Sequence, residues 1–153
     1  MKDNTPIKKI ADNRAAYHNY FVEEKYEAGI ELLGNEVKSL RAAKMNFKDS
    51  WVQIENGEAF VVAMHISPYD KGNIWAPDPL RRRRLLLHKR EIIKLQSEVS
   101  RAGKTLIPLS LYFKHGKVKM SVGICKGKDL HDKRRSAAEK DIKREIDRAM
   151  KTR

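Results

Sequence analysis

The sequence predicts a mainly β fold with helices: an OB-type antiparallel β-barrel with a long helix between strands 3 and 4, plus a basic C-terminal tail. Three observations predict it. Short apolar runs bounded by turn residues recur before residue 126, and one central segment has apolar residues at helical spacing. The last residues, 127–153, are dense in charge and poor in large apolar side chains.

Composition limits the kind of protein. Lys and Arg number 33 against 20 Asp and Glu, which gives a net charge of +13. The single Cys125 excludes an intramolecular disulfide and multi-cysteine metal or iron–sulfur sites. No apolar run approaches the roughly 18 residues of a membrane span. We therefore expect a soluble, cytoplasmic monomer with no metal and no cofactor, whose partners are anionic.

The N-terminal half predicts an arm and then strands. Residues 1–12 are polar and charged, which favours a flexible arm before a barrel at 13–126. Residues 17–33 favour a long strand that bends near Gly29, because aromatic and β-branched residues dominate its first half. We expect a short helix over 35–44, with Asn35 as its cap.

A hairpin and a loop follow. Residues 50–55 and 59–66 are typical of strands, and Asn56-Gly57 between them favours a tight hairpin turn, since both residues tolerate positive φ. Residues 68–79 contain three prolines and a glycine, so we expect a surface loop there.

The central segment predicts the long helix. Asp78 suits its cap, Pro79 its first turn and Gly103 its end. Its apolar stripe comprises Leu85, His88, Ile92, Leu95, Val99 and Ala102. Residues 105–113 and 118–124 then predict two strands that turn at His115-Gly116.

Four consecutive arginines, Arg81 to Arg84, would open this helix. Cations in a first turn oppose the helix dipole, so helix stability does not explain them. A solvated helix face, a nuclear localisation signal and an acidic membrane surface are alternatives. An anionic partner is favoured, and nucleic acid is favoured over membrane because no lipidation motif or aromatic anchor accompanies the run.

The tail carries its own pattern. Residues 126–153 hold 11 basic and 6 acidic side chains. From residue 136 onward a thin apolar stripe follows helical spacing, and its large members are Ile142, Ile146 and Met150. Because so short an isolated helix is marginal in water, we expect a tail that is disordered when free and helical on a polyanion. A helix docked on the barrel is the alternative.

Catalytic patterns are missing from the sequence. It contains no phosphate-binding loop, no zinc-type histidine pair and no paired carboxylates suited to two metals, so we expect no enzyme. His18 lies near Arg14, Tyr17 and Tyr20, where rings beside cations can stack on unpaired bases. A solvent-facing strand residue is the alternative interpretation of His18.

Short segments in a shared order carry a family resemblance. They include Asn13-Arg14 before His18, Glu27-Ala28-Gly29-Ile30, Glu36 to Arg41, Asp49-Ser50, His65-Ile66, Pro68-Tyr69, Arg84 to His88, Pro108-Leu109, Leu111-Tyr112, Lys126-Gly127-Lys128 and Asp132-Lys133-Arg134. In these segments the chain resembles the SmpB family, the small protein partners of transfer-messenger RNA (tmRNA) in bacterial trans-translation.

The resemblance implies a function. It implies a barrel that binds the tRNA-like domain of tmRNA, and a tail that enters the vacant decoding centre and messenger channel of a stalled ribosome. The implied partners are tmRNA, the ribosome with its small-subunit RNA, and elongation factor Tu through the shared RNA. The alternative is a generic OB-fold RNA- or single-strand-binding protein that uses its tail only for electrostatic affinity.

The resemblance also implies site residues. Matched RNA-binding positions are Asn13, His18, Glu27, Leu87 and Lys119, and charge alone adds Arg14, Lys38, Arg41 and Lys126. Matched tail positions are Gly127, Lys128, Asp132, Lys133, Arg134, Ile142 and Met150. Two tail positions depart from the family pattern: Asp129 replaces a common lysine, and Ile142 stands where an aromatic is often found.

Overall fold

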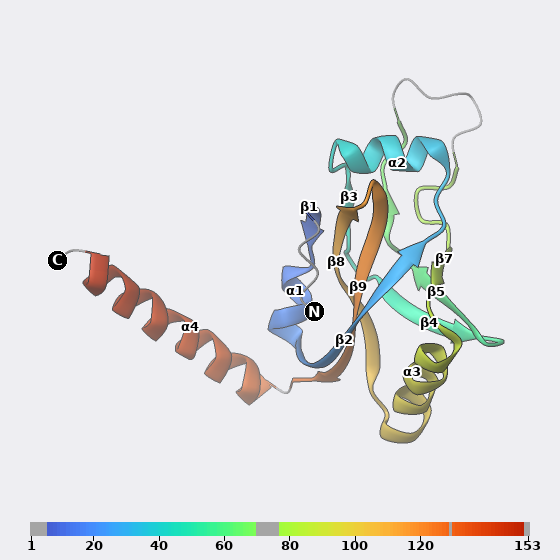
Figure 1. Cartoon of the computed structure of the whole chain (residues 1–153). Coiled ribbons are helices and arrows are strands. Elements are labelled where there is room, and N and C mark those ends of the chain that lie inside the picture. The colour runs from blue at the N-terminus through green and yellow to red at the C-terminus, as the bar shows by residue number, and fades with distance from the viewer. Residues whose placement is uncertain (1–5, 70–76, 129, 152–153) are drawn as a thin grey trace.

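The fold is that of a computed structural model, which describes residues 6–69, 77–128 and 130–151. Strands dominate the first 127 residues and one long helix ends the chain (Figure 1). The elements are β1 (Ile7–Asp12), α1 (Arg14–Asn19), β2 (Tyr20–Ile30), α2 (Gly34–Arg41), β3 (Met45–Asn46), β4 (Trp51–Glu55), β5 (Glu58–Val62), β6 (His65–Ile66), β7 (Arg83–Leu86), α3 (Lys89–Ala102), β8 (Thr105–Lys114), β9 (Lys117–Gly127) and α4 (Leu130–Lys151).

Seven strands form one antiparallel sheet in the order β1-β8-β9-β2-β7-β5-β4, and β3 pairs separately with β6. Figure 1 shows α2 across one end of the sheet and α3 near the other. β4 approaches β8 although the two strands are not neighbours in the sheet order, which shows that the sheet curls. No backbone pairing joins its two edge strands among the described residues. The mainly β fold is therefore confirmed, whereas a closed barrel is not found.

Strand alternation divides the sheet into a buried face and an outer face. Ala28 on β2 pairs with Met120 on β9, which pairs with Leu111 on β8, and all three side chains are fully buried. Leu95 of α3 is buried in the same core. The neighbouring positions on these strands therefore project from the outer face.

The long helix begins later than the sequence predicts. Residues 83–86 form β7, which pairs with both β2 and β5. Its side chains alternate between buried and exposed, so period two overrides the helical stripe that included Leu85. The helix starts at Lys89, where the Glu91 carboxylate accepts a 3.0 Å hydrogen bond from the backbone N–H of His88. Gly103 ends it with φ of +63°, as predicted.

The N-terminal prediction is also corrected. Residues 7–12 are not an arm in the structure: they form β1, which pairs with β8 from Ile7 opposite Lys114 onward. Residues 14–19 form α1 rather than the start of a strand, because Asn13 caps a segment that contains two alanines. The hairpins are confirmed, with positive φ at Asn56-Gly57 and at His115-Gly116.

The tail is helical from residue 130, earlier than the predicted 136. α4 projects away from the sheet, and its contact with the rest of the fold includes α1 (Figure 1). Of the described helices, none combines the length and apolarity needed to cross a membrane. The disorder predicted for the free tail stays a prediction.

Candidate nucleic-acid interface

Asn13 anchors α1 to β8. Its Nδ2 donates to the Pro108 carbonyl at 2.8 Å, its backbone N–H donates to the Leu109 carbonyl at 2.7 Å, and its Oδ1 accepts from the Ala16 N–H at 3.3 Å. The residue is 8% exposed. Since its polar groups are used inside the protein, Asn13 positions the helix rather than offering a surface contact.

The outer side of α1 gathers aromatic and cationic groups. Arg14, Tyr17 and His18 are exposed. All three belong to α1, so His18 lies on a helix rather than on the predicted strand. Lys128 joins the tail to this region: its backbone N–H donates to the Asn19 carbonyl at 2.9 Å, and its Nζ donates to the Tyr17 carbonyl at 3.1 Å. The same ammonium lies 4.9 Å from the centroid of the exposed Phe21 ring.

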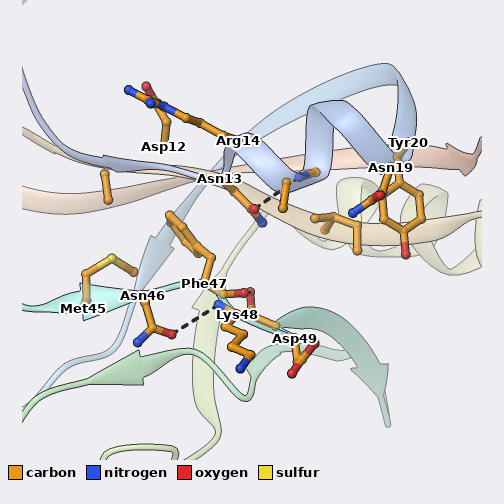
Figure 2. Close-up of a pocket in the computed structure, with 15 residues that line it drawn as sticks. Asp12, Asn13, Arg14, Asn19, Tyr20, Met45, Asn46, Phe47, Lys48 and Asp49 are labelled. Atoms are coloured by element: carbon orange, nitrogen blue, oxygen red, sulfur yellow. Dashed lines mark hydrogen bonds between the residues drawn. The ribbon is translucent and has the colours of Figure 1, made fainter. Parts of the chain in front are cut away.

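A hollow of about 560 Å³ lies beside α1 (Figure 2). Asn13 and Arg14 line one side, and residues 45–50 line the other. Lys48 and Asp49 project from this second side (Figure 2). Its lining mixes charges of both signs with apolar groups, so it can admit a polar ligand without selecting a charge.

Glu27 stands on the outer face of β2. Its Oε2 accepts a 2.5 Å hydrogen bond from the Tyr112 hydroxyl, and its Oε1 lies 3.4 Å from Lys114 Nζ. Burial and the hydrogen bond to Glu27 raise the pKa of the Tyr112 phenol well above its ordinary value. Glu27 is 40% exposed, so its carboxylate is oriented by the protein and still open to a ligand.

Lys119 belongs to the same outer face. It pairs with Tyr112 on β8 and with Gly29 on β2. It also lines a second hollow of about 370 Å³, together with Lys117 and Leu86. The structure therefore brings Glu27 and Lys119 together, as a carboxylate and an ammonium on adjoining strands.

Leu87 does not join that surface. It is half-buried and packs against the core, whereas its neighbour Leu86 is 48% exposed. An effect of Leu87 on binding would therefore be indirect, through the packing of the segment between β7 and α3.

α2 carries Lys38 and Arg41, both exposed. Lys38 Nζ lies 5.4 Å from the centroid of the Tyr69 ring. The helix is fixed by Glu36, which is buried and accepts from the Leu33 N–H at 2.9 Å and from Arg83 Nε at 2.7 Å. α2 is thus a third cationic surface, and its Val37 lines the second hollow together with Lys119.

Glu36 stays ionised within the fold. Burial pushes the pKa of its carboxyl upward, but the hydrogen bonds from Arg81, the Leu33 amide and Arg83, with the charge of Arg83, outweigh burial and leave the pKa below its ordinary value. Arg83 is 1% exposed, and its guanidinium also donates to the carbonyls of Met64 and Pro79.

The arginine run is paired inside the protein. Arg81 and Arg83 bind Glu36. Arg82 pairs with Glu55 and lies 3.9 Å over the Phe60 ring, and Arg84 lies 3.4 Å from Glu31 and 3.6 Å from Glu58. These residues lie in β7 and the turn before it, so the prediction that they open a helix was wrong, whereas an anionic partner for the run stays a prediction. The neutralising carboxylates come from α2, β4, β5 and the end of β2.

The tail residues are placed in part. Lys126 and Gly127 are exposed at the end of β9, and Arg134 and Ile142 are exposed on α4. Asp132, Lys133 and Met150 belong to α4, but their side chains lie outside the described part of the chain, as does all of Asp129. Apart from Lys128, which is bonded to α1, the described tail side chains therefore face solvent.

Sequence reasoning missed Tyr112, Lys114 and Phe21. Strand alternation held a signal for Tyr112, because it follows the buried Leu111 and must face outward. Its partner Glu27 lies 85 residues away, so the pairing itself had no local signal. In the described ranges no three His, Cys, Asp or Glu side chains form a group suited to a metal ion.

Together these features define a class: a small, basic nucleic-acid-binding protein with an antiparallel sheet, a polar outer face and a protruding cationic helix. Comparison with known proteins then gives the family. The model of the family described as "SmpB protein" matches residues 10–152. The chain belongs to the SmpB family.

Individual relatives support the same family assignment. The SsrA-binding protein of Clostridium botulinum strain Hall is 60% identical over 144 residues, which cover 94% of this chain and 92% of the relative. That of Clostridium acetobutylicum ATCC 824 is 55% identical over 150 residues, covering 98% and 97%. A solved chain described as "tmRNA-SmpB: a journey to the center of the bacterial ribosome" matches with a TM-score of 0.67 and 43% identity, covering 83% of this chain and 93% of that one.

Proposed function

We propose that this chain is a non-enzymatic RNA-binding adaptor for ribosome rescue. It binds the tRNA-like domain of tmRNA and delivers that RNA to stalled ribosomes for trans-translation. The observation that carries the proposal is the near full-length match to proteins described as SsrA-binding, at 60% identity over 144 residues. The curled sheet, in which β4 approaches β8, supports an OB-type arrangement for the RNA-binding domain.

The sheet domain grips the RNA through groups of different chemistry. Arg14, Lys119 and Lys126 position phosphates, because cationic side chains fix the register of a nucleic acid without reading its sequence. His18 stacks on or donates to a base at α1. Asn13 holds α1 in place for these contacts, and Lys38 and Arg41 extend the cationic surface along α2.

The tail engages the ribosome separately. The described cations of α4 are exposed, and α1 is the one element with which the described part of α4 makes more than slight contact. A helix with so little packing is marginal when free, so the tail is disordered alone and becomes helical when ribosomal RNA phosphates neutralise it. In the vacant decoding centre it replaces the missing codon–anticodon duplex.

Two tail residues that differ from the family pattern change the contacts that the tail makes with ribosomal RNA. Asp129 removes one phosphate contact that a lysine would make at that position. Ile142 substitutes apolar packing for aromatic stacking on a base. The protein acts as a monomer, and it meets elongation factor Tu only through the RNA that both bind.

A competition measurement tests this function. The labelled tRNA-like domain of tmRNA is displaced from the full chain by unlabelled tRNA-like domain or by unstructured RNA of equal length, over a series of salt concentrations. We expect a preference for the folded domain that persists as salt rises, because shape and base contacts are less screened than phosphate contacts. Equal competition by both RNAs would favour the generic single-strand-binding alternative.

A further inference from the structure

Glu27 raises a question of charge. Glu27 lies on the same outer face as Lys119, which the proposed function places against RNA, yet its carboxylate repels phosphate. It can attract RNA only through hydrogen-bond donors, which lie on bases and on ribose hydroxyls. Its presence on an RNA-facing surface therefore indicates that it recognises a donor group.

The structure holds this carboxylate in one orientation. The Tyr112 hydroxyl donates to Oε2 at 2.5 Å, and Lys114 Nζ lies 3.4 Å from Oε1 and 3.5 Å from Oε2. Both partners come from β8, two strands away from Glu27 in the sheet order. Lys114 is 16% exposed and Glu27 is 40% exposed, so the supporting groups lie deeper than the carboxylate that they hold.

Two acceptor positions stay open. A carboxylate has about four lone-pair sites, and Tyr112 takes one of them. The long Lys114 contacts leave acceptor capacity on both oxygens of a carboxylate that is 40% exposed. Such a pair matches two adjacent donors, as in bidentate carboxylate recognition.

We propose that Tyr112 is a positioning residue that holds Glu27 to read an unpaired guanine of the bound RNA, with the carboxylate accepting from N1–H and N2–H. The inference rests on the proposed function. Of the four RNA bases, guanine alone presents two adjacent donors on its Watson–Crick edge. Lys119, which pairs with Tyr112 across β8 and β9, lies where it can bind a phosphate of the same nucleotide strand.

The test is a double-mutant cycle on full-length protein with the tRNA-like domain of tmRNA as the probe. Glu27→Gln should weaken binding at least about tenfold, because one acceptor becomes a donor that faces a guanine donor. Tyr112→Phe should weaken binding about fivefold with no change in salt dependence, since every phosphate contact is retained. In the Glu27→Gln background, Tyr112→Phe should have no further effect.

The chain offers a matched control. Tyr26 donates to Glu24 Oε2 at 3.3 Å, also on β2. Tyr26→Phe therefore removes a hydroxyl from a second tyrosine–glutamate pair, and it should leave RNA affinity unchanged. A Tyr112→Phe variant that binds like wild type, or one that weakens binding by the same factor with and without Glu27, would overturn the inference.

The guanine itself is tested in the RNA. Inosine lacks the N2 amino group, so replacing each unpaired guanine in turn by inosine should reveal one position at which wild-type affinity falls and Glu27→Gln affinity does not. No such position would overturn guanine recognition. If wild type still prefers the folded domain over unstructured RNA in the same titrations, only this inference fails and the proposed function stands.

Discussion

Two regions of this chain are rich in cations, and the structure uses their charges differently. Arg81 to Arg84 lie in and before β7, where each guanidinium meets a carboxylate of the same protein, and Arg83 is buried. The described cations of α4 project into solvent on a helix that leaves the sheet (Figure 1). Arg81 and Arg83 of the first region hold the fold together through the buried Glu36, whereas the second region presents its cations to a polyanion.

The difference teaches that charge density alone does not identify a nucleic-acid surface. In the arginine run, strand alternation sends Arg83 inward and Arg84 outward. Long-range pairing then supplies Glu36 from α2 and Glu55 from β4. On α4, by contrast, Arg135 pairs locally with Glu139 at 3.5 Å, and both side chains are exposed. An exposed pair between neighbouring turns of one helix contributes little to stability.

Removal of the tail should have the largest effect on function. Deleting residues 130–153 keeps Lys128, which is bonded to α1, and removes all of α4. We expect affinity for the tRNA-like domain to change less than about threefold, because the sheet domain carries those contacts. Peptide tagging on stalled ribosomes, measured in a reconstituted translation system, should be abolished. A truncated chain that still supports full tagging would contradict the division between the two regions.

The next largest effect concerns the buried cluster. Glu36→Ala leaves the buried Arg83 and the half-buried Arg81 without their carboxylate. Breaking a buried ion pair on one side costs about 3–5 kcal/mol, so we expect a loss of that order in the free energy of unfolding, measured by urea denaturation. Glu55→Ala is the matched control, because its pair with Arg82 is exposed and should cost less than about 1 kcal/mol. Equal losses would contradict the assignment of Glu36 as the structural partner.

The same carboxyl predicts a pH dependence. The pKa of Glu36 is lowered in the folded state, so the stability it contributes is present above the unfolded pKa and is lost as pH falls through the folded pKa. Unfolding free energy should therefore decline below about pH 4.5. In Glu36→Gln this acid-dependent part should shrink when urea midpoints are compared across pH. An unchanged pH profile would mean that Glu36 is not held ionised by the arginines.

A smaller loss of stability is expected where Asn13 joins α1 to β8. Asn13→Ala removes the cap of α1 and the bond to the Pro108 carbonyl, at a cost of about 1–2 kcal/mol in unfolding free energy. Asn13→Ser keeps a capping oxygen and loses the Nδ2 donor without adding a charge, so its cost should be lower. If both variants weakened RNA binding with no loss of stability, Asn13 would contact the RNA directly rather than position α1.

Local signals in the sequence predicted some features and missed others for identifiable reasons. Asn56-Gly57 and Gly103 fix a hairpin and a helix end by their own backbone preferences, and both predictions were right. Arg83–Leu86 was assigned to a helix because four residues cannot separate the two periods. Its true partners, β2 and β5, are distant in sequence.

The candidate site divides in the same way. Glu27, Lys119 and the exposed tail cations were reached through family resemblance and charge, and the structure places them at the surface. The RNA contact expected of Asn13 stays a prediction, but its role in anchoring α1 was missed, because its bonds to Pro108 and Leu109 depend on a fold that brings residues 95 positions apart together. Tyr112 was missed for the same reason.

The central claim is that carboxylates of the sheet domain neutralise the arginine run, whereas exposed cations of α4 such as Arg134 and Arg144 bind ribosomal RNA. The salt dependence of binding to stalled ribosomes tests it most directly. In Arg134→Gln/Arg144→Gln the slope of log K against log[salt] should shrink by about 0.7 for each phosphate that the variant no longer neutralises. In Arg82→Gln/Arg84→Gln the slope should match wild type. A smaller slope for the Arg82/Arg84 variant and an unchanged slope for the α4 variant would contradict the account.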